Sequence, residues 1–562
     1  MTGPTSALAI DLDAGERLHV WQRPIGPGRA PSVEVRDSAG AATILCGPRS
    51  GDFAPALYEA RRAGPVALHW DEAATRVSLI YAWRPAHVIG EGVRVLWTSP
   101  QNRPDNARYR LHLRAPFGWM NDPNGCCEIG GLTHVFYQHY PHSHRWNNMH
   151  WGHAVSANLI DWVHLPVFLN PRPEMLADKA KSGGAFSGSA IARESGGLRV
   201  FYTDHEDRRE PEMEVQLTAV STDLIAAGAS APIIERRPPI PGFRRDMRDP
   251  YVFKGPDGVW KMLLGGADEE AALVLLYESR HSEGAEDWTY AAILHREPLA
   301  RAVPAECPCL VALEGAGAGL FVLTFGLIGL RDAATLRRNL SYMIVGRFDG
   351  RRFDETARRE LDFGADCYAF QAFAHHLGPH GVAWAANWTD VFRDRDYFSA
   401  MTFPRRLIWR DGMLLTPPAE SVRELRCALL ADDAAKLAAG LALPDGLAEI
   451  DVAFARAGAP FRLVFAHPTH QIALVYDGAT LELQFEPPGH RVTPRYVAQD
   501  VSLSRLQVII DVGLIEIFAD GGRWCATKRI DSDEPINSIT LHAEHVDGGR
   551  AEAWRLRPRR GG

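Results

Sequence analysis

Short runs in which hydrophobic and polar residues alternate recur along most of the chain, and this period of two is typical of β-strands with one buried face. In the first part of the sequence, such runs at residues 18–21, 66–70 and 77–81 are separated by segments rich in Pro and Gly. The pattern predicts a small β-rich accessory region over residues 1–105. No residue of this region suggests a chemical role.

From residue 106 to residue 415 the strand pattern continues, with few segments of helical periodicity. Polar or acidic positions recur beside strand-rich segments at intervals of about 60 residues. These positions are Asp122, residues 186–189, Asp249, Glu306 and Asp366. Five equivalent positions that converge on a central channel are what a five-bladed β-propeller would give. We therefore expect residues 106–415 to form a five-bladed propeller.

The last part of the chain returns to alternating strands separated by turn residues, for example at residues 461–465, 472–476 and 514–518. This arrangement predicts a C-terminal β-sandwich over residues 416–562. A stabilising role is the simplest interpretation of this region. Together the three regions make the chain an all-β protein.

The heptapeptide WMNDPNG at residues 119–125 places the carboxylate of Asp122 next to the amide of Asn121. Pro, Asn and Gly in succession favour a tight turn, so the segment is expected to be a strand or loop that ends in a turn. Most acidic residues in such turns are structural caps. A carboxylate beside an amide would also suit a polyhydroxylated ligand, and the rest of the chain must decide between the two roles.

Two further acidic residues have unusual neighbours. Asp249 follows Arg248, whose charge is expected to keep the carboxylate ionised, and Glu306 lies between two prolines that stiffen the backbone. Glycoside hydrolysis needs one neutral and one ionised carboxyl group across the scissile bond, and a third carboxylate on the sugar would strengthen binding of the transition state. With 69 Asp and Glu residues in the chain, only the combination is informative.

Charge and composition narrow the possible partners. The formal net charge is −8 and no basic segment is interleaved with aromatic residues, so nucleic acid is not an expected partner. No signal peptide or membrane span is visible, which favours a cytoplasmic protein that does not contact a membrane. The eight cysteines fit no disulfide or zinc pattern and are expected to be reduced. Five histidines crowd residues 139–153 without a metal-binding spacing, so neither a metal nor another cofactor is expected.

The chain carries an ordered series of motifs that resembles glycoside hydrolase family 32, the family of invertases, inulinases, levanases and related β-fructosidases. In chain order the motifs are WMNDPNG (119–125), FYQ (136–138), WNNMHWGHA (146–154), FSGS (186–189), RDP (248–250), ECP (306–308), DFGADCYA (362–369), WAANW (384–388) and FPRRL (403–407).

The resemblance implies a role for each matching residue. Asp122 would be the nucleophile, Glu306 the general acid/base and Asp249 the stabiliser of the transition state. The residues implied in substrate binding are Asn121, Gln138, Trp146, Phe186, Ser187, Arg248, Asp366 and Trp388. This chain departs from the family pattern at Cys367, Phe370, Ala385 and Ala386, which leaves the specificity for the leaving group open.

By the same resemblance, the chain would be a retaining hydrolase that releases terminal β-D-fructofuranosyl units from sucrose or short fructans through a covalent fructosyl-enzyme. A fructosyltransferase would use the same three acids with a sugar acceptor in place of water. A binding protein without turnover is a third hypothesis, and the three retained acids argue against it. The N-terminal region could cover a subunit interface or narrow the mouth of the active site, and the oligomeric state cannot be predicted.

Overall fold

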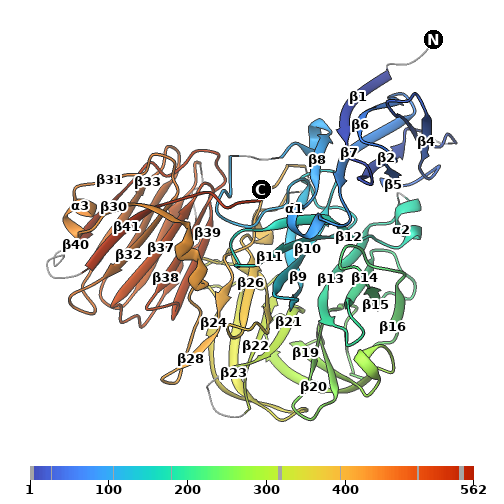
Figure 1. The fold of residues 1–562 in the computed structure, drawn as a ribbon. Helices are drawn as coiled ribbons and strands as arrows, with labels where there is room; N and C mark the ends of the chain where they lie inside the picture. The colour runs from blue at the N-terminus through green and yellow to red at the C-terminus, as the bar shows by residue number, and fades with distance from the viewer. Residues whose placement is uncertain are drawn as a thin grey trace.

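The computed structural model describes residues 5–26, 28–104, 107–178, 180–313, 319–392, 394–489, 493–543 and 550–561. Strands dominate these residues, and their sheets fall into three groups that follow one another along the chain (Figure 1). The prediction of an all-β protein with a propeller followed by a sandwich is confirmed. The exact domain boundaries stay predictions, and residue 105 lies outside the described residues.

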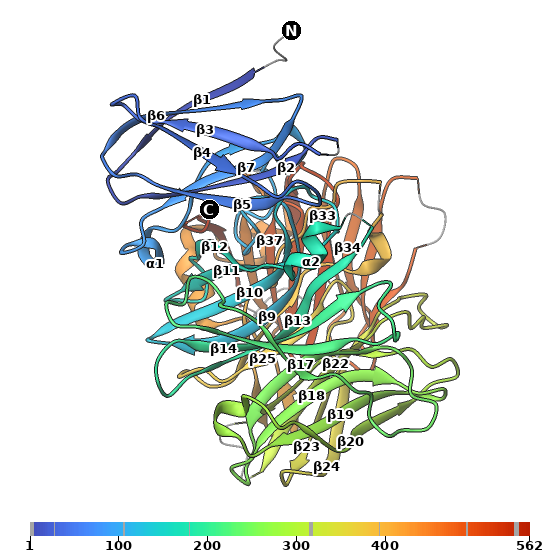
Figure 2. The same ribbon diagram turned by 90° about the vertical axis from the view of Figure 1, so that its right-hand side faces the viewer.

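Two four-stranded antiparallel sheets form the N-terminal group, which Figure 2 shows above the propeller. Inward-facing residues such as Leu18, Val33, Leu68 and Ile80 join the two sheets in one core. One sheet contains β1 (Thr5–Leu12), β6 (Gly64–Asp71), β3 (Ser32–Arg36) and β4 (Ala42–Cys46), and the other contains β5 (Ala54–Glu59), β2 (Arg17–Pro24), β7 (Thr75–Trp83) and β8 (Arg94–Thr98).

Five antiparallel sheets form the blades of the propeller. Blade 1 consists of β9 (Trp119–Ile129), β10 (Leu132–Tyr140), β11 (His150–Ser156) and β12 (Val163–Leu169). Blade 2 consists of β13 (Gly183–Ala192), β14 (Leu198–Glu206), β15 (Val215–Ser221) and β16 (Ala231–Ile234). Blade 3 consists of β17 (Met247–Lys254), β18 (Trp260–Ala267), β19 (Ala271–Ser279) and β20 (Thr289–Pro298). Blade 4 consists of β21 (Ala305–Ala312), β22 (Leu320–Leu327), β23 (Ser341–Phe348) and β24 (Phe353–Glu360). Blade 5 has three strands, β25 (Tyr368–Phe373), β26 (His380–Trp384) and β27 (Arg405–Arg406), and the two-stranded sheet of β28 (Ile408–Arg410) and β29 (Met413–Leu415) follows it.

The first strand of each blade faces the centre of the ring. Each of these five strands contacts the first strand of the next blade, and β25 contacts β9, so the ring closes. Four of the five positions that recur in the sequence lie in these first strands, and the fifth, Asp366, lies two residues before the start of β25. The recurrence therefore marks one equivalent place per blade.

Every first strand also carries a β-bulge at this place. The pairing register shifts between Met120 and Pro123 in β9, and the corresponding shifts in the other blades span residues 185–188, 248–251, 306–309 and 368–371. The predicted tight turn after Asp122 is therefore wrong, because β9 continues through residues 123–125 to Ile129. The edge position of β9 and the bulge explain why the strand tolerates Pro123.

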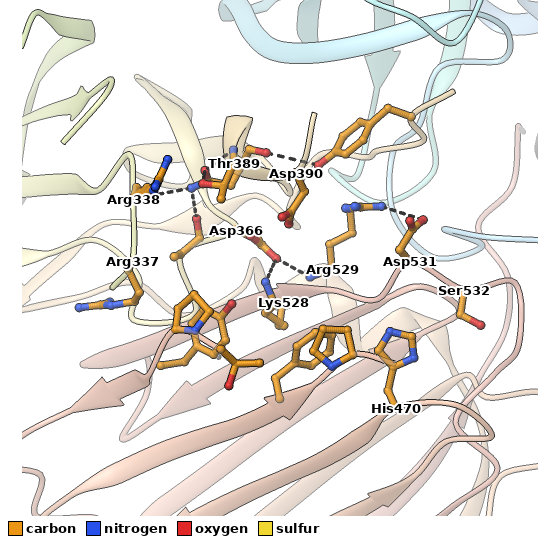
Figure 3. A pocket seen from close by; sticks show the side chains of 18 of the residues that line it. Arg337, Arg338, Asp366, Thr389, Asp390, His470, Lys528, Arg529, Asp531 and Ser532 are labelled. Atoms are coloured by element: carbon orange, nitrogen blue, oxygen red, sulfur yellow. Dashed lines mark hydrogen bonds and ion pairs between the residues drawn. The ribbon is translucent and has the colours of Figure 1, made fainter. Parts of the chain in front are cut away.

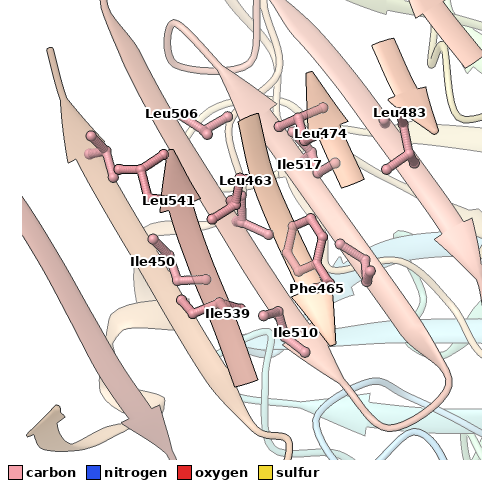
Figure 4. Close-up of a cluster of buried hydrophobic side chains, with 14 of the residues drawn as sticks. Ile450, Leu463, Phe465, Leu474, Leu483, Leu506, Ile510, Ile517, Ile539 and Leu541 are labelled. Carbon is pink, nitrogen blue, oxygen red and sulfur yellow. The ribbon is translucent and has the colours of Figure 1, made fainter. Parts of the chain in front are cut away.

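The C-terminal group is a sandwich of two six-stranded sheets. Branched and aromatic side chains from both sheets interdigitate between them, as Figure 4 shows for Ile450, Leu463, Leu474 and Ile517. One sheet contains β30 (Arg426–Ala431), β41 (Arg550–Leu556), β32 (Ala448–Ala453), β37 (Arg505–Asp511), β38 (Leu514–Ala519) and β39 (Trp524–Arg529), and the other contains β31 (Leu441–Ala442), β40 (Ser538–Ala543), β33 (Phe461–Ala466), β34 (Gln471–Tyr476), β35 (Leu481–Glu486) and β36 (Tyr496–Ala498).

Helices are short in the described residues, and none is long and apolar enough to cross a membrane. The α-helices are α1 (Val88–Glu91), α2 (Pro173–Ala177) and α3 (Ala434–Ala438). The 3₁₀ turns are Pro100–Asn102, Ser282–Gly284, Trp388–Asp390 and Glu420–Leu425. The eight cysteines are all free thiols, as the sequence predicted.

A buried ionic network joins the propeller to the sandwich. Arg405 at the start of β27 contacts Asp362 (3.1 Å) and Glu516 of β38 (2.8 Å). His112 lies between Glu516 (3.1 Å) and Asp511 of β37 (2.7 Å). All five side chains are buried. The sandwich is thereby fixed against the ring by alternating positive and negative charges.

Candidate active site

A cavity of about 350 Å³ opens among the first strands of the propeller. Ten of the eleven residues predicted from the sequence line it, including all three acids; Asp366 does not. The bulges explain this convergence, because a bulge turns a side chain out of the regular alternation of a strand. The lining residues are Asn121, Asp122, Gln138, Trp146, Phe186, Ser187, Arg248, Asp249, Glu306, Ile328, Trp388 and Val391.

Asp122 is buried in the bulge of β9, and other polar side chains line the cavity beside it. Ser187 donates a hydrogen bond to its Oδ2 atom (3.0 Å), while its Oδ1 atom is buried and has no hydrogen-bond partner among the described residues. Burial raises the pKa of Asp122, and the Asn121 and Ser187 side chains oppose this rise. The carboxylate thus has one oxygen held in place and one buried oxygen whose hydrogen-bonding capacity the described residues do not use.

Glu306 lies beside the bulge of β21 and receives two hydrogen bonds. The Tyr368 hydroxyl donates to Oε2 (2.8 Å), and Nη1 of Arg248 donates to Oε1 (2.8 Å). Burial raises the pKa of Glu306 to about 7, against the opposing charge of Arg248 and with a further increase from the Asp122 carboxylate. A carboxyl group with this pKa is partly protonated near neutral pH and can deliver a proton and take it back.

Asp249 is the bulged residue of β17 and has a positive φ of 65°, which few residues other than glycine adopt. The backbone N–H of Cys307 donates to its Oδ2 atom (2.8 Å). Burial, followed by the charge of Glu306, raises the pKa of Asp249 well above its ordinary value, and Arg248 offsets only part of the increase. The expectation that Arg248 keeps Asp249 ionised is therefore wrong.

The reason lies in the partners of Arg248. Its Nε donates to Glu214 (3.0 Å), its Nη1 donates to Glu306, and its Nη2 pairs with Asp246. Glu214 is buried, and its pKa is nevertheless lowered to about 2, chiefly by the charge of Arg248. This one guanidinium therefore already compensates other carboxylates. It cannot neutralise Asp249 as well.

Aromatic rings form the walls of the cavity. Phe186 stacks on His205 with ring centroids 4.3 Å apart, and Trp146 meets Phe186 edge to face at 6.2 Å. On another side, Trp388 stacks against Trp119 at 5.9 Å. Rings beside carboxyl and amide groups suit the apolar faces and hydroxyl edges of a sugar.

Asp366 is the predicted site residue that lies elsewhere. Its Oδ2 atom accepts hydrogen bonds from Nζ of Lys528 (2.6 Å) and from the backbone N–H of Arg529 (2.9 Å), both on β39 of the sandwich. It lines a larger cavity between the propeller and the sandwich. Asp366 precedes the bulge of blade 5, so the sandwich, and not the ring centre, supplies its partners.

Sequence reasoning missed several residues of the site. Tyr368 belongs to the DFGADCYA motif but carries no signal that separates it from a core aromatic residue, and Glu214 lies in no motif. Ile328 and Val391 line the cavity from loops. The prolines at positions 123, 250 and 308 are a usable signal for the bulges, since proline inside a sheet favours bulges and edges. The four positions that depart from the family pattern are buried and line neither cavity.

The N-terminal sheets contact the segment that carries Trp146. Tyr140 donates to the half-buried carboxylate of Asp52 (3.2 Å), and the side-chain amide of Asn148 also donates to it (3.4 Å). Ser78 binds His142 (2.8 Å), and the ring of Phe53 packs on the same histidine at 4.4 Å. The accessory region therefore supports one wall of the cavity from outside.

The described residues include a group of potential metal ligands outside the cavity. In the described residues, one group places three donor atoms within 4.8 Å of one another, and it consists of Glu128, His375 and His376 outside the cavity. Both oxygens of Glu128 already accept hydrogen bonds from His376 (2.6 and 2.7 Å). Burial lowers the pKa of the crowded histidines His139, His142, His150 and His153, whose rings pack among aromatic side chains.

Comparison with known proteins gives consistent matches. The sucrose-6-phosphate hydrolase of Escherichia coli is 29% identical over 463 residues, which cover 77% of this chain and 91% of that protein. The levanase of Bacillus subtilis is 30% identical over 329 residues, 54% of this chain and 45% of that protein. The structure of a glycoside hydrolase family 32 protein from Bifidobacterium adolescentis matches with a TM-score of 0.87 at 23% identity, covering 98% of this chain and 100% of that one.

Family models cover both the propeller and the sandwich. The model of the glycosyl hydrolases family 32 N-terminal domain matches residues 112–418, and the model of the family 32 C-terminal domain matches residues 434–555. The first of these alone spans more than half of the chain. The chain is a glycoside hydrolase and belongs to glycosyl hydrolase family 32.

Proposed function

We propose that this chain is a retaining β-fructofuranosidase that releases terminal β-D-fructofuranosyl units from sucrose or short fructans. The names of its relatives, which include a sucrose-6-phosphate hydrolase, a raffinose invertase and a levanase, support a fructoside substrate. The observation that carries the proposal is the placement of Asp122, with one unpartnered oxygen, in the same cavity as Glu306, whose pKa is about 7.

The proposed reaction has two steps. Glu306 donates its proton to the glycosidic oxygen while the Asp122 carboxylate attacks the anomeric carbon, so that the bond to the leaving group breaks as the fructosyl ester forms. Glu306 then removes a proton from water, which releases fructose and frees Asp122. Asp249, held by the N–H of Cys307, binds ring hydroxyls more strongly as the oxocarbenium-like state forms.

The remaining lining residues would bind the fructosyl unit. Trp146, Phe186 and Trp388 provide apolar faces, and Asn121, Gln138 and Ser187 provide polar groups. A volume of about 350 Å³ suits one sugar unit and its immediate neighbourhood, which favours release of terminal units. The same acids would also serve a fructosyltransferase, and no residue of the cavity favours an acceptor sugar over water.

Product analysis tests the proposal. Incubation with sucrose, inulin and levan should release free fructose from at least one substrate, and Asp122→Asn should abolish the release without loss of folding. Products longer than the substrate would point to transfer instead of hydrolysis. The absence of fructose from every substrate would reject the proposal.

A further inference from the structure

Glu214 directly precedes β15 and does not line the catalytic cavity, and its side chain is almost completely buried. Its carboxylate reaches Arg248, which does line the cavity. Nε of Arg248 donates to both carboxylate oxygens, at 3.0 and 3.1 Å. A buried acid that contacts the cation of the site from behind can affect the reaction without touching the substrate.

Glu214 also fixes the backbone of the bulge in β17. Its Oε2 atom accepts a hydrogen bond from the N–H of Met247 (2.7 Å), and the side-chain amide of Gln216 donates to the carbonyl oxygen of Met247 (2.7 Å). The amide oxygen of Gln216 accepts from Thr203 (2.7 Å), and the hydroxyl oxygen of Thr203 accepts from the N–H of Asp249 (2.9 Å). Side chains of blade 2 therefore hold the backbone on both sides of the arginine.

The same carboxylate contacts the aromatic wall of the cavity. Oε1 of Glu214 lies 2.8 Å from Nδ1 of His205, and Nε2 of this histidine lies 2.8 Å from Asp207. The ring of His205 stacks on Phe186 with centroids 4.3 Å apart. Glu214 is thus connected both to the arginine of the site and to a ring that forms its wall.

The carboxylates around Arg248 outnumber its single charge. Nη1 donates to Glu306 (2.8 Å), Nε donates to Glu214 (3.0 Å) and Nη2 pairs with Asp246. In the larger cavity of about 1020 Å³ between propeller and sandwich, by contrast, the ammonium group of Lys528 pairs with one carboxylate, at 2.6 Å (Figure 3). Glu306 therefore receives only part of one positive charge.

The other titratable groups around Glu306 come from the first strands of the blades. Asp122 of β9 and Asp249 of β17 are acids, and the Tyr368 hydroxyl of β25 donates to Oε2 (2.8 Å). The thiol of Cys307, whose pKa is raised by burial, follows Glu306 in β21. Of the described residues that line the cavity, the arginine of β17 alone carries a permanent positive charge. A group that competes for this charge therefore acts on Glu306.

We propose that Glu214 is a positioning residue for the acid: it fixes Arg248 against Glu306 and takes up part of the guanidinium charge, so that Glu306 can serve as a proton donor. The proposal rests on the fructosidase function above and adds the residue that sets the pH range of the site. Against the effect of burial, the charge of Arg248 lowers the pKa of Glu214 to about 2, whereas the pKa of Glu306 is about 7. Of two acids on one cation, the acid outside the cavity is the ionised one.

Glu214→Gln tests this division of charge, because it removes the charge and keeps the length of the side chain and one oxygen acceptor. Arg248 then has one acid fewer to compensate, so it should favour the ionised form of Glu306 and lower its pKa. The alkaline limb of kcat/KM for fructose release should move to lower pH by roughly 1 unit. A displacement of this size lowers kcat/KM about tenfold at pH 8 and less than about twofold at pH 5.

Glu212→Gln is the matched control, because it removes the same charge two residues earlier. Glu212 is exposed and pairs with Arg245 (2.9 Å), and neither residue lines the cavity. Its pH profile should match that of wild type. A loss in Glu214→Gln that is equal at every pH would indicate a structural role only. That result, or a limb that stays in place or moves to higher pH, would overturn the proposal.

Asp246→Asn supplies a second variant in case Glu214→Gln does not fold. The side chain of Asp246 is partly exposed and pairs with Nη2 of Arg248, so its removal frees the same guanidinium with less disturbance of the interior. The alkaline limb should move in the same direction by a smaller amount. An unchanged limb in Asp246→Asn would reject the division of charge even without the first variant.

Proton titration gives a readout that does not depend on turnover. The difference between the titration curves of a protein and of its Glu306→Gln variant reports the proton of residue 306. Its midpoint should lie near pH 7 for the wild-type pair and roughly 1 unit lower for the pair that carries Glu214→Gln. Equal midpoints would overturn the proposal. If wild-type protein releases fructose from no substrate, the proposed function fails, and this titration still decides the role of Glu214.

Discussion

The structure contains two clusters of buried charged groups, one in the catalytic cavity and one at the junction of propeller and sandwich, and their charges are arranged differently. In the catalytic cavity, the acids Asp122, Asp249 and Glu306 lie with a single guanidinium, that of Arg248, which bonds to Glu306 alone among the three and is also committed to Glu214. At the junction of propeller and sandwich, positive and negative groups alternate from Asp362 through Arg405, Glu516 and His112 to Asp511.

The pKa values follow this difference. At the junction, Arg405 and His112 overcome the effect of burial and lower the pKa of Glu516, while the two acids raise the pKa of His112 to about 9. In the cavity, burial raises the pKa of all three acids, and the charges of neighbouring carboxylates raise the pKa of Asp249 and Glu306 further. Both clusters are desolvated, and the neighbouring charges decide whether the effect of burial is overcome: at the junction they overcome it for Glu516, and in the cavity they do not overcome it for the three acids. Alternating positive and negative side chains stabilise the junction of propeller and sandwich. In the cavity, burial beside other carboxylates gives Glu306 a pKa of about 7, which suits it for proton transfer.

The largest effect is expected at the nucleophile. Asp122→Asn should lower kcat/KM by about 10⁴-fold or more, because a carboxamide does not form the fructosyl ester. The free energy of unfolding at pH 7 should stay equal or rise, since burial disfavours the native carboxylate. Fructose release and guanidinium denaturation of the same preparation measure the two quantities, with the exposed Asp11→Asn as control. A loss of activity that accompanies a loss of folding would remove the support for a catalytic role.

The opposite result is expected at the junction. Glu516→Gln should lower the free energy of unfolding by about 3–5 kcal/mol, because it leaves Arg405 and His112 with less compensation in a buried site. Denaturation by guanidinium chloride, with the exposed Glu269→Gln as control, measures the change. Unchanged stability would show that the charges at the junction do not hold the sandwich in place.

The junction should also respond to pH through His112. Its pKa is about 9 in the folded protein against an ordinary value of 6.5, so its contribution to stability is fully present below pH 6.5 and is lost as the pH rises through 9. The loss amounts to roughly 3 kcal/mol. Unfolding curves between pH 6 and pH 9.5 should show this decline in wild type and in the exposed-histidine control His542→Asn, and a much smaller one in His112→Asn. A decline of the same size in all three would contradict the role of His112.

The smallest effect is expected from Tyr368→Phe. The Tyr368 hydroxyl donates to Glu306 and favours its ionised form, so its removal should raise the pKa of Glu306. The alkaline limb of the pH profile of kcat/KM should then move to higher pH, with a change of less than about tenfold in the maximum. A displacement to lower pH would mean that the hydroxyl acts on Glu306 in another way. Tyr342→Phe, remote from the cavity, is the matched control.

The two clusters also mark what the sequence could and could not predict. The propeller and the cavity residues were accessible because each blade repeats its polar position and because the motifs are local. Asp366 lies outside the cavity because its partners Lys528 and Arg529 come from the sandwich, more than 160 residues away in the chain. The junction was not predicted at all, since nothing in the local sequence shows that Arg405 and Glu516 meet.

Two local errors have physical causes as well. Residues 123–125 have the composition of a turn, yet ring closure keeps them in an edge strand, where a bulge accommodates the proline. The neighbour of Asp249 in sequence is Arg248, but the guanidinium turns to Glu214 and Glu306. Both side chains line the cavity, so adjacency in the sequence does not by itself decide which carboxylates a guanidinium bonds to.

The pH dependence of kcat/KM for fructose release by wild-type protein tests the central claim most directly. Because Glu306 must be protonated in the free enzyme and its pKa is about 7, activity should fall as the pH rises through about 7. In Glu306→Gln, the remaining activity should lack this alkaline limb. An alkaline limb that persists unchanged in Glu306→Gln, or a wild-type profile that stays flat between pH 6 and pH 9, would contradict the assignment of Glu306 as the acid.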